Sequence, residues 1–215
     1  MRKIVLVEDR PERQRKFTED LTIDLNKFPA LENICGGKTF GDFKSSLADI
    51  SQIGAVIKEK GYDVIMIHRS ALEQSERIAL IEIAKRDSKT IVFFSGGISS
   101  VSLQEIGNKG YLLTINSKDF YSESLKNYLE SPEHNIFELA FGKKWKINFE
   151  IELLEKLNFY SKEKSESPFA AISLELNLKE WLIDNYFSDY KNKRITREDL
   201  EQIKEKILTN LNKTI

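Results

Sequence analysis

Short runs of β-branched residues and leucine alternate with amphipathic segments from residue 1 to about residue 130. Runs of this kind are typical of parallel strands that helices cover on both faces. We therefore predict an α/β domain with a doubly wound, five-stranded parallel sheet. The predicted strands occupy residues 3–8, 31–35, 62–67, 90–94 and 111–115.

The segments between these runs have the signals of helices. The first helix is predicted to begin with Asp9 as its N-cap, because Pro11 lies in the first turn and Glu12 three residues after the cap. Phe17, Leu21 and Leu25 then follow at helical spacing. The further predicted helices lie within residues 40–60 (one or two helices), 73–86, 100–106 and 118–129.

A break at Ser131-Pro132 divides the chain into residues 1–131 and a C-terminal region, residues 132–215. The strand–helix alternation stops there, and we predict a mainly α-helical region. The segment from Trp145 to Leu153 alternates like a strand, but helical spacing continues beyond it and favours a helix. Other helices are predicted from Ser167 toward Tyr186, and from Thr196 with an apolar stripe of Leu200, Ile203, Ile207 and Leu211.

The composition excludes several classes of protein. The chain has 33 Lys and Arg against 34 Asp and Glu, so it lacks the positive field of a typical nucleic-acid-binding protein. The single cysteine, Cys35, forms no internal disulfide and builds no thiolate zinc site alone. No apolar run reaches the roughly 20 residues of a membrane-spanning helix, and the N-terminal sequence lacks the pattern of a secretory signal. We expect a cytoplasmic protein with no membrane partner.

Polar residues gather where the predicted strands end. Ligands of a doubly wound sheet bind beyond the carboxyl ends of its strands, so these residues are the candidates for a functional site. They are Glu8, Asp9, His68, Ser95 and Thr114.

The order and spacing of these segments give the chain a family resemblance. Residues 1–130 resemble the receiver domain of bacterial two-component response regulators, through KIVLVEDRPERQRKF, YDVIMIHRSAL, TIVFFSGG and GYLLTINSKDF. The resemblance implies a phosphorylation pocket in which an acidic pair holds Mg²⁺, an Asp accepts phosphate, and a hydroxyl and a Lys contact it. By position Glu8 and Asp9 match the acidic pair and Ser95 the hydroxyl. His68 stands at the acceptor position and Thr114 at the lysine position.

These departures predict a degenerate pocket. An acyl phosphate needs a carboxylate nucleophile, and its charge needs a metal ion and a cation. We therefore expect no catalytic residue, no cofactor and at most weak Mg²⁺ binding at Glu8 and Asp9. Helix capping without a metal is the alternative role of Asp9. His68 is expected to be a neutral residue hydrogen-bonded to Glu8 or Asp9, with a pH-responsive His–carboxylate pair as the alternative.

The C-terminal region is rich in aromatic residues, including Trp145 and Trp181. These side chains form a docking surface or homodimer interface, or they pack the region onto the first domain; the sequence leaves both open. We expect a signalling adaptor, not an enzyme, that works without phosphorylation through protein–protein contacts. The alternative is a DNA-binding response regulator. Against it, residues 133–215 hold 14 Lys and Arg and 15 Asp and Glu, with no basic excess.

Overall fold

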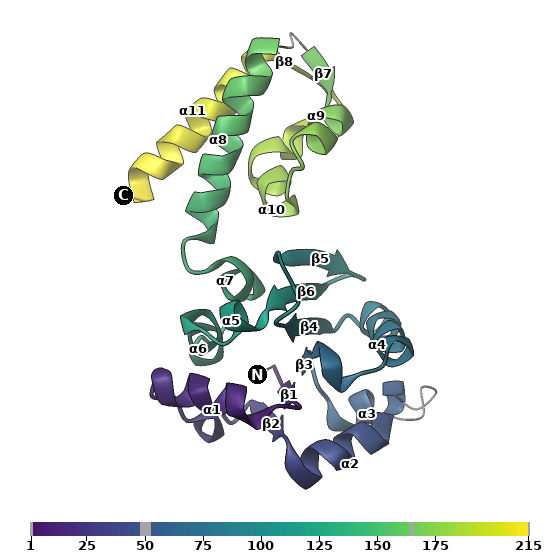
Figure 1. Ribbon diagram of the computed structural model, residues 1–215. Coiled ribbons are helices and arrows are strands. Elements are labelled where there is room, and N and C mark those ends of the chain that lie inside the picture. Colours follow the sequence, from purple (N-terminus) through teal and green to yellow (C-terminus); the bar gives the residue numbers. More distant parts are fainter. Residues whose placement is uncertain (1, 48–52, 164–165, 215) are drawn as a thin grey trace. The chain divides into compact units, whose positions relative to one another are not determined.

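The structure, a computed structural model, describes residues 2–47, 53–163 and 166–214. The chain divides into two compact units, residues 1–143 and 144–215. The first unit contains a mixed α/β sheet with strand order β2-β1-β3-β4-β6-β5 (Figure 1). Its strands are β1 (Ile4–Glu8), β2 (Leu31–Cys35), β3 (Val64–His68), β4 (Thr90–Ser95), β5 (Ser102–Ile106) and β6 (Gly110–Asn116).

Five of these strands are parallel and correspond to the five predicted runs, in an order compatible with a flavodoxin-like sheet. The strand β5 is the exception, because it pairs antiparallel with β6 where the sequence analysis predicted a helix over residues 100–106. That prediction, and with it the five-stranded sheet, was wrong. The turn between the two strands explains the error. Gly107 has a φ of +63°, and a Cβ on Gly110 would lie 2.2 Å from the carbonyl oxygen of Lys89. Gly107 therefore permits the turn of the hairpin, and Gly110 permits the close approach of β6 to the carbonyl of Lys89.

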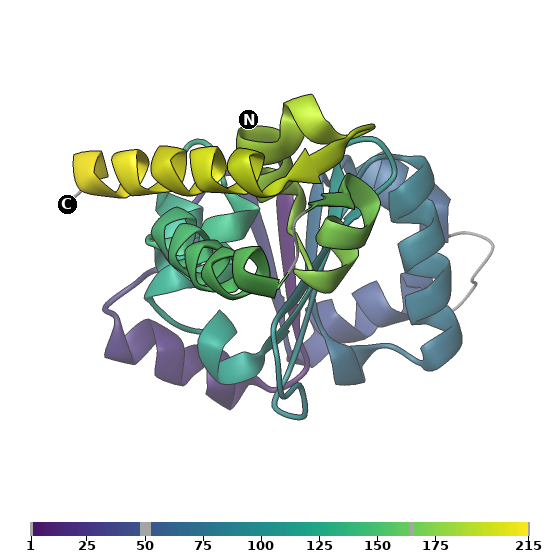
Figure 2. The same ribbon diagram turned by 90° about the horizontal axis from the view of Figure 1, so that it is seen from above.

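Helices cover both faces of the sheet (Figure 2). One face, which includes Val5, Ile65 and Phe93, packs against the helices α2 (Gly37–Leu47), α3 (Ile53–Lys60) and α4 (Gln74–Arg86). The opposite face, which includes Leu6 and Phe94, packs against other helices. These are α1 (Pro11–Asp20), α5 (Ser117–Phe120), α6 (Glu123–Glu130) and α7 (Ile136–Phe141), and two short 3-10 turns, η1 (Leu25–Lys27) and η3 (Arg69–Ala71), complete the unit.

The helix α7 lies beyond Ser131-Pro132, where the sequence analysis divided the chain. Its residues Ile136, Leu139 and Ala140 are buried in the same core as α6. The compact first unit accordingly runs on to residue 143.

The second unit begins with the long helix α8 (Trp145–Glu163), so the segment with two competing patterns is helical. The stripe Leu200–Ile203–Ile207–Leu211 is buried, as expected, and Asp199 accepts hydrogen bonds from the backbone and hydroxyl of Thr196. A two-stranded antiparallel ribbon, β7 with β8, was not predicted. The remaining elements are β7 (Glu166–Pro168), α9 (Phe169–Glu175), α10 (Glu180–Leu182), η4 (Ile183–Phe187), η5 (Ser188–Tyr190), β8 (Arg194–Thr196) and α11 (Arg197–Thr214).

Aromatic side chains of the second unit pack on one another. The ring centroids of Trp145 and Trp181 lie 5.0 Å apart, and those of Trp145 and Phe149 lie 5.5 Å apart. Trp145 is buried, so part of the aromatic content builds the core of this unit. Among the described helices, none is long and apolar enough to span a bilayer.

Candidate functional site

The candidate site lies at the carboxyl edge of the sheet, between β1 and β3. Glu8 ends β1, Asp9 follows it, and His68 ends β3, which is the neighbour of β1. From β1 the chain continues to β2 on one side of it and then to β3 on the other side. The carboxyl edge between β1 and β3 is therefore the topological switch point of the sheet. Of the five predicted site residues, the structure brings Glu8, Asp9 and His68 together.

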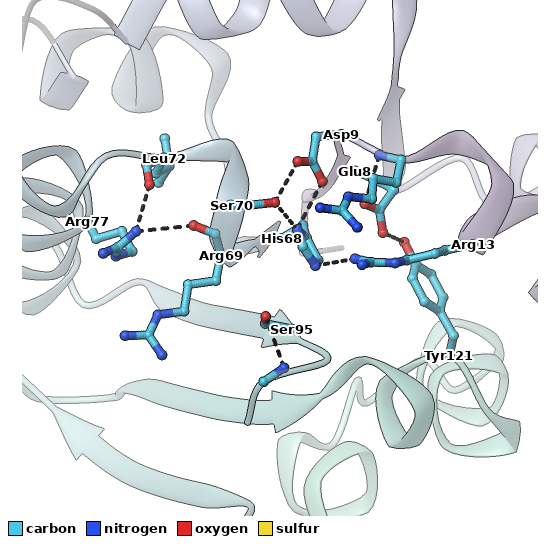
Figure 3. A network of polar contacts seen from close by, with 12 residues as sticks. Glu8, Asp9, Arg13, His68, Arg69, Ser70, Leu72, Arg77, Ser95 and Tyr121 are labelled. Carbon is cyan, nitrogen blue, oxygen red and sulfur yellow. Dashed lines mark hydrogen bonds and ion pairs between the residues drawn. The ribbon is translucent and has the colours of Figure 1, made fainter. Parts of the chain in front are cut away.

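Asp9, Ser70 and His68 form a compact hydrogen-bonded cluster (Figure 3). The Nδ1 atom of His68 lies 2.9 Å from Oδ1 of Asp9 and 2.6 Å from Oγ of Ser70. The hydroxyl of Ser70 donates to Oδ2 of Asp9 at 2.5 Å. The sequence analysis predicted that Asp9 caps the first helix. That prediction was wrong, because the carboxylate of Asp9 bonds to Ser70 and His68 instead. Arg10 is the N-cap of α1 and makes no side-chain capping bond.

The other ring nitrogen of His68 contacts Arg13. A guanidinium nitrogen of Arg13, on α1, lies within hydrogen-bonding distance of Nε2. Because a guanidinium only donates, Nε2 must accept, and the ring proton must then reside on Nδ1, facing Asp9 and Ser70. Both nitrogens of His68 are thus engaged by the protein itself.

The charges around His68 favour its neutral form. Burial lowers the pKa of His68, Asp9 partly offsets that effect, and the cations Arg13 and Arg10 lower it further. For Asp9, burial acts to raise the pKa, but the hydrogen bonds from Ser70 and from Glu8 bring it below its usual value. The cluster is therefore an anionic Asp9, a neutral His68 and a cationic Arg13.

Glu8 occupies a different environment, although it adjoins Asp9 in the chain. Its side chain is fully buried, accepts from the backbone N–H of Arg10 at 3.0 Å, and accepts from the hydroxyl of Tyr121 at 3.0 Å. Burial raises the pKa of Glu8 to about 7, and these two hydrogen bonds offset the effect only in part. Near neutral pH this carboxyl group is consequently partly protonated.

This arrangement does not have the geometry of a nucleophilic triad. In such a triad the hydroxyl and the carboxylate contact opposite nitrogens of the imidazole. Here Ser70 and Asp9 share Nδ1, and Arg13 contacts Nε2. His68 therefore does not activate Ser70 as a general base.

Among the described residues, one cluster holds three side chains that could bind a metal ion together, and it consists of Glu8, Asp9 and His68. Ligand atoms of Glu8, Asp9 and His68 lie within 4.8 Å of one another. Mg²⁺ prefers near-octahedral oxygen ligands, whereas this set offers one nitrogen, a carboxylate engaged by Ser70 and His68, and a partly protonated carboxyl. The residues present fit Mg²⁺ poorly.

Titration calorimetry with MgCl₂ is therefore expected to show no saturable binding at neutral pH. Magnesium would have to displace His68 from Asp9 and a proton from Glu8. Asp20→Ala, which removes an exposed carboxylate of α1, is the matched control for Asp9→Ala. A saturable isotherm that only Asp9→Ala abolishes would contradict this prediction.

Ser95 and Thr114 lie apart from this cluster. The hydroxyl of Ser95 accepts from the backbone N–H of Gly97 at 3.4 Å, within its own turn. Thr114 pairs with Phe93 in the register of β4 and β6, and both line a groove beside α4. This face is opposite the one that packs against α1 and α5. Thr114 thus does not belong to the predicted pocket, because successive residues of a strand point to opposite faces.

The sequence analysis missed Arg13, Ser70 and Tyr121. Arg13 precedes the buried Phe17 by four residues, so one face of α1 carries both, and that spacing was the available signal. Ser70 follows His68 by two residues and was within reach of it. Tyr121 lies 113 residues from Glu8, and no local pattern links the two.

Comparison of the chain with models of known protein families, with curated proteins and with solved structures finds no match. The class of the protein therefore rests on its fold and on its candidate site. It is an α/β protein with a mostly parallel sheet, and its candidate site is a polar cluster at the carboxyl edge.

Proposed function

We propose that this protein is a signalling or regulatory adaptor, a pseudo-receiver that works without phosphorylation and through protein–protein contacts. The observation that carries the proposal is the engagement of both ring nitrogens of His68, by Asp9 and Ser70 on one side and Arg13 on the other. A residue at the acceptor position of a receiver-like sheet is thereby occupied by its own neighbours.

The electrostatics of the site support the same function. A phosphoryl group brings negative charge that a metal ion or a free cation must balance. Arg13, a cation at this site, already contacts Nε2 of His68, while Nδ1 of the same ring faces the carboxylate of Asp9. A cluster whose charges are balanced internally suits a fixed conformation better than a phosphorylation cycle.

The second unit supplies surface for association, with a protein partner or with a second copy of the chain. Phe159 is 67% exposed and Leu174 is 83% exposed, and both are apolar side chains in helices of this unit. Exposed apolar groups of this size are common at protein interfaces. The lone cysteine and the absence of any disulfide pair suit a reducing cytoplasm.

Incubation with acetyl phosphate and MgCl₂ is expected to leave the intact mass of the protein unchanged. His68 offers no free nitrogen, and no carboxylate lies at the acceptor position. A phosphoryl adduct that disappears in His68→Ala would contradict the proposal.

The adaptor role itself is tested by affinity capture from lysate of the native organism, with and without the phosphoryl donor. We expect the same proteins in both samples. A partner set that depends on the donor would contradict phosphorylation independence. Recovery of no partner, together with a monomer in sedimentation, would contradict the adaptor role.

A further inference from the structure

A groove of about 560 Å³ lies in the first unit on the face of the sheet opposite the Asp9–His68 cluster. It runs beside α4 over the carboxyl ends of β4 and β6. Two arginines, Arg69 and Arg77, line it together with apolar side chains and several hydroxyl groups. No residue that lines it carries a carboxylate.

The groove exists because the connection between β4 and β6 forms the strand β5, whereas a helix in this connection would cover the face of the sheet. On this face α2, α3 and α4 pack against the sheet, and α4 reaches β4 and β6. The connection between β4 and β6 then adds β5 to the sheet edge and contributes no helix. Among the described helices that pack on this face, none lies beyond α4, so the edge of the sheet past α4 has no helical cover.

The floor and wall of the groove carry apolar side chains beside the polar ones. Phe93 and Leu112 come from β4 and β6, and Ile81 comes from α4. Ile78, one turn earlier on α4, is 55% exposed although it is a large aliphatic side chain in a well-formed helix. A surface of this kind gains stability when another apolar element covers it.

Arg69 and Arg77 give the rim of the groove positive charge, and neither forms an ion pair with another described residue. Arg77 donates from one guanidinium nitrogen to the carbonyl oxygens of Leu72 and Arg69, at 2.6 and 3.2 Å. The guanidinium of Arg69 has no hydrogen-bond or ion-pair partner among the described residues, and Figure 3 shows its side chain pointing away from the Asp9–His68–Arg13 cluster. Two guanidinium groups beside an apolar floor select a ligand that is both apolar and anionic.

We propose that this groove binds an acidic amphipathic helix of a partner protein. No described helix covers the sheet past α4 on this face, the apolar side chains of the groove fit the apolar side of a helix, and Arg69 and Arg77 fit glutamate or aspartate along its edge. This inference rests on the proposed adaptor function and names the class of its partner.

The probe is a synthetic peptide of about 15 residues, long enough for a helix to form on binding, with leucine at every third or fourth position and glutamate between them. A second peptide carries lysine in place of glutamate. Fluorescence anisotropy of the labelled peptides with the full chain measures affinity, and amide shifts of the protein locate the contact. We expect the acidic peptide to bind at least about tenfold tighter than the basic one, and to shift amides of α4, β5 and β6.

Two variants test the groove itself. Arg69→Glu reverses an exposed charge, and Ile78→Ser removes an exposed apolar side chain, so neither is expected to impair folding. Each is expected to weaken binding of the acidic peptide about tenfold. Arg15→Glu, the same charge reversal on α1 at the other face, is the matched control and should leave affinity within about twofold.

Absence of saturable binding would overturn the inference, as would equal affinity for both peptides or shifts confined to the second unit. Binding that Arg69→Glu and Ile78→Ser leave unchanged would overturn it as well. If the acidic peptide does not bind but partner capture is independent of the phosphoryl donor, the groove proposal is refuted and the adaptor function stands. Donor-dependent capture refutes the proposed function.

Discussion

Replacing Glu8 by glutamine is expected to stabilise the first unit by up to about 3 kcal/mol at pH values above about 7.5, and to have little effect below about pH 4. Burial raises the pKa of Glu8 to about 7 from an ordinary value of 4.5. In that range the folded state binds more protons than the unfolded state, so stability falls as pH rises through it. Glutamine carries no charge at any pH and still offers an oxygen to Tyr121 or to the N–H of Arg10.

Hydrogen exchange of amides in β1 and β3, followed by mass spectrometry at both pH values, measures this effect within the first unit. Glu12→Gln is the control, because it makes the same chemical change at an exposed residue of α1. Equal stabilisation by Glu8→Gln at high and low pH would show that the carboxyl group does not titrate in the folded state near neutrality.

Truncation of Phe94 to alanine is expected to lower the free energy of unfolding of the first unit by about 3–5 kcal/mol. Phe94 is fully buried in β4, and its ring stacks on that of Phe120 with centroids 4.1 Å apart. It also contacts the rings of His68 and Tyr121, each at a centroid distance of 5.4 Å. The lost ring leaves a cavity beneath the polar cluster, so exchange of amides near His68 should accelerate as well.

The two units can be followed separately, because both tryptophans, Trp145 and Trp181, lie in the second unit. Tryptophan fluorescence during urea unfolding reports that unit, while hydrogen exchange in the strands reports the first. Phe159→Ala makes the same truncation at a side chain that is 67% exposed, and it should change stability by less than about 0.5 kcal/mol. A comparable loss in both variants would mean that Phe94 is not part of a tightly packed core.

Several features of the fold follow from the sequence alone. The strands β1, β3 and β4 were predictable because each is a run of β-branched and large apolar residues that is buried on both faces of the sheet. The long helix α11 was predictable from local signals, namely the Thr196–Asp199 capping box and the stripe from Leu200 to Leu211. Glu8, Asp9 and His68 could be placed together because neighbouring parallel strands end at the same edge.

Only the tertiary structure decided the rest. The segment of residues 100–106 is short enough to fit a helix or a strand, and pairing with β6 selects the strand β5. In the sequence, Arg13 does not differ from the other charged residues of a surface helix. Its contact with His68 depends on how α1 packs beside the end of β3. Thr114 lies within the predicted fifth strand, as expected, but its position in the register of β6 directs its side chain to the opposite face of the sheet. The groove beside α4 arises for the same physical reason: side-chain direction and strand pairing depend on partners distant in the chain, which local periodicity does not encode.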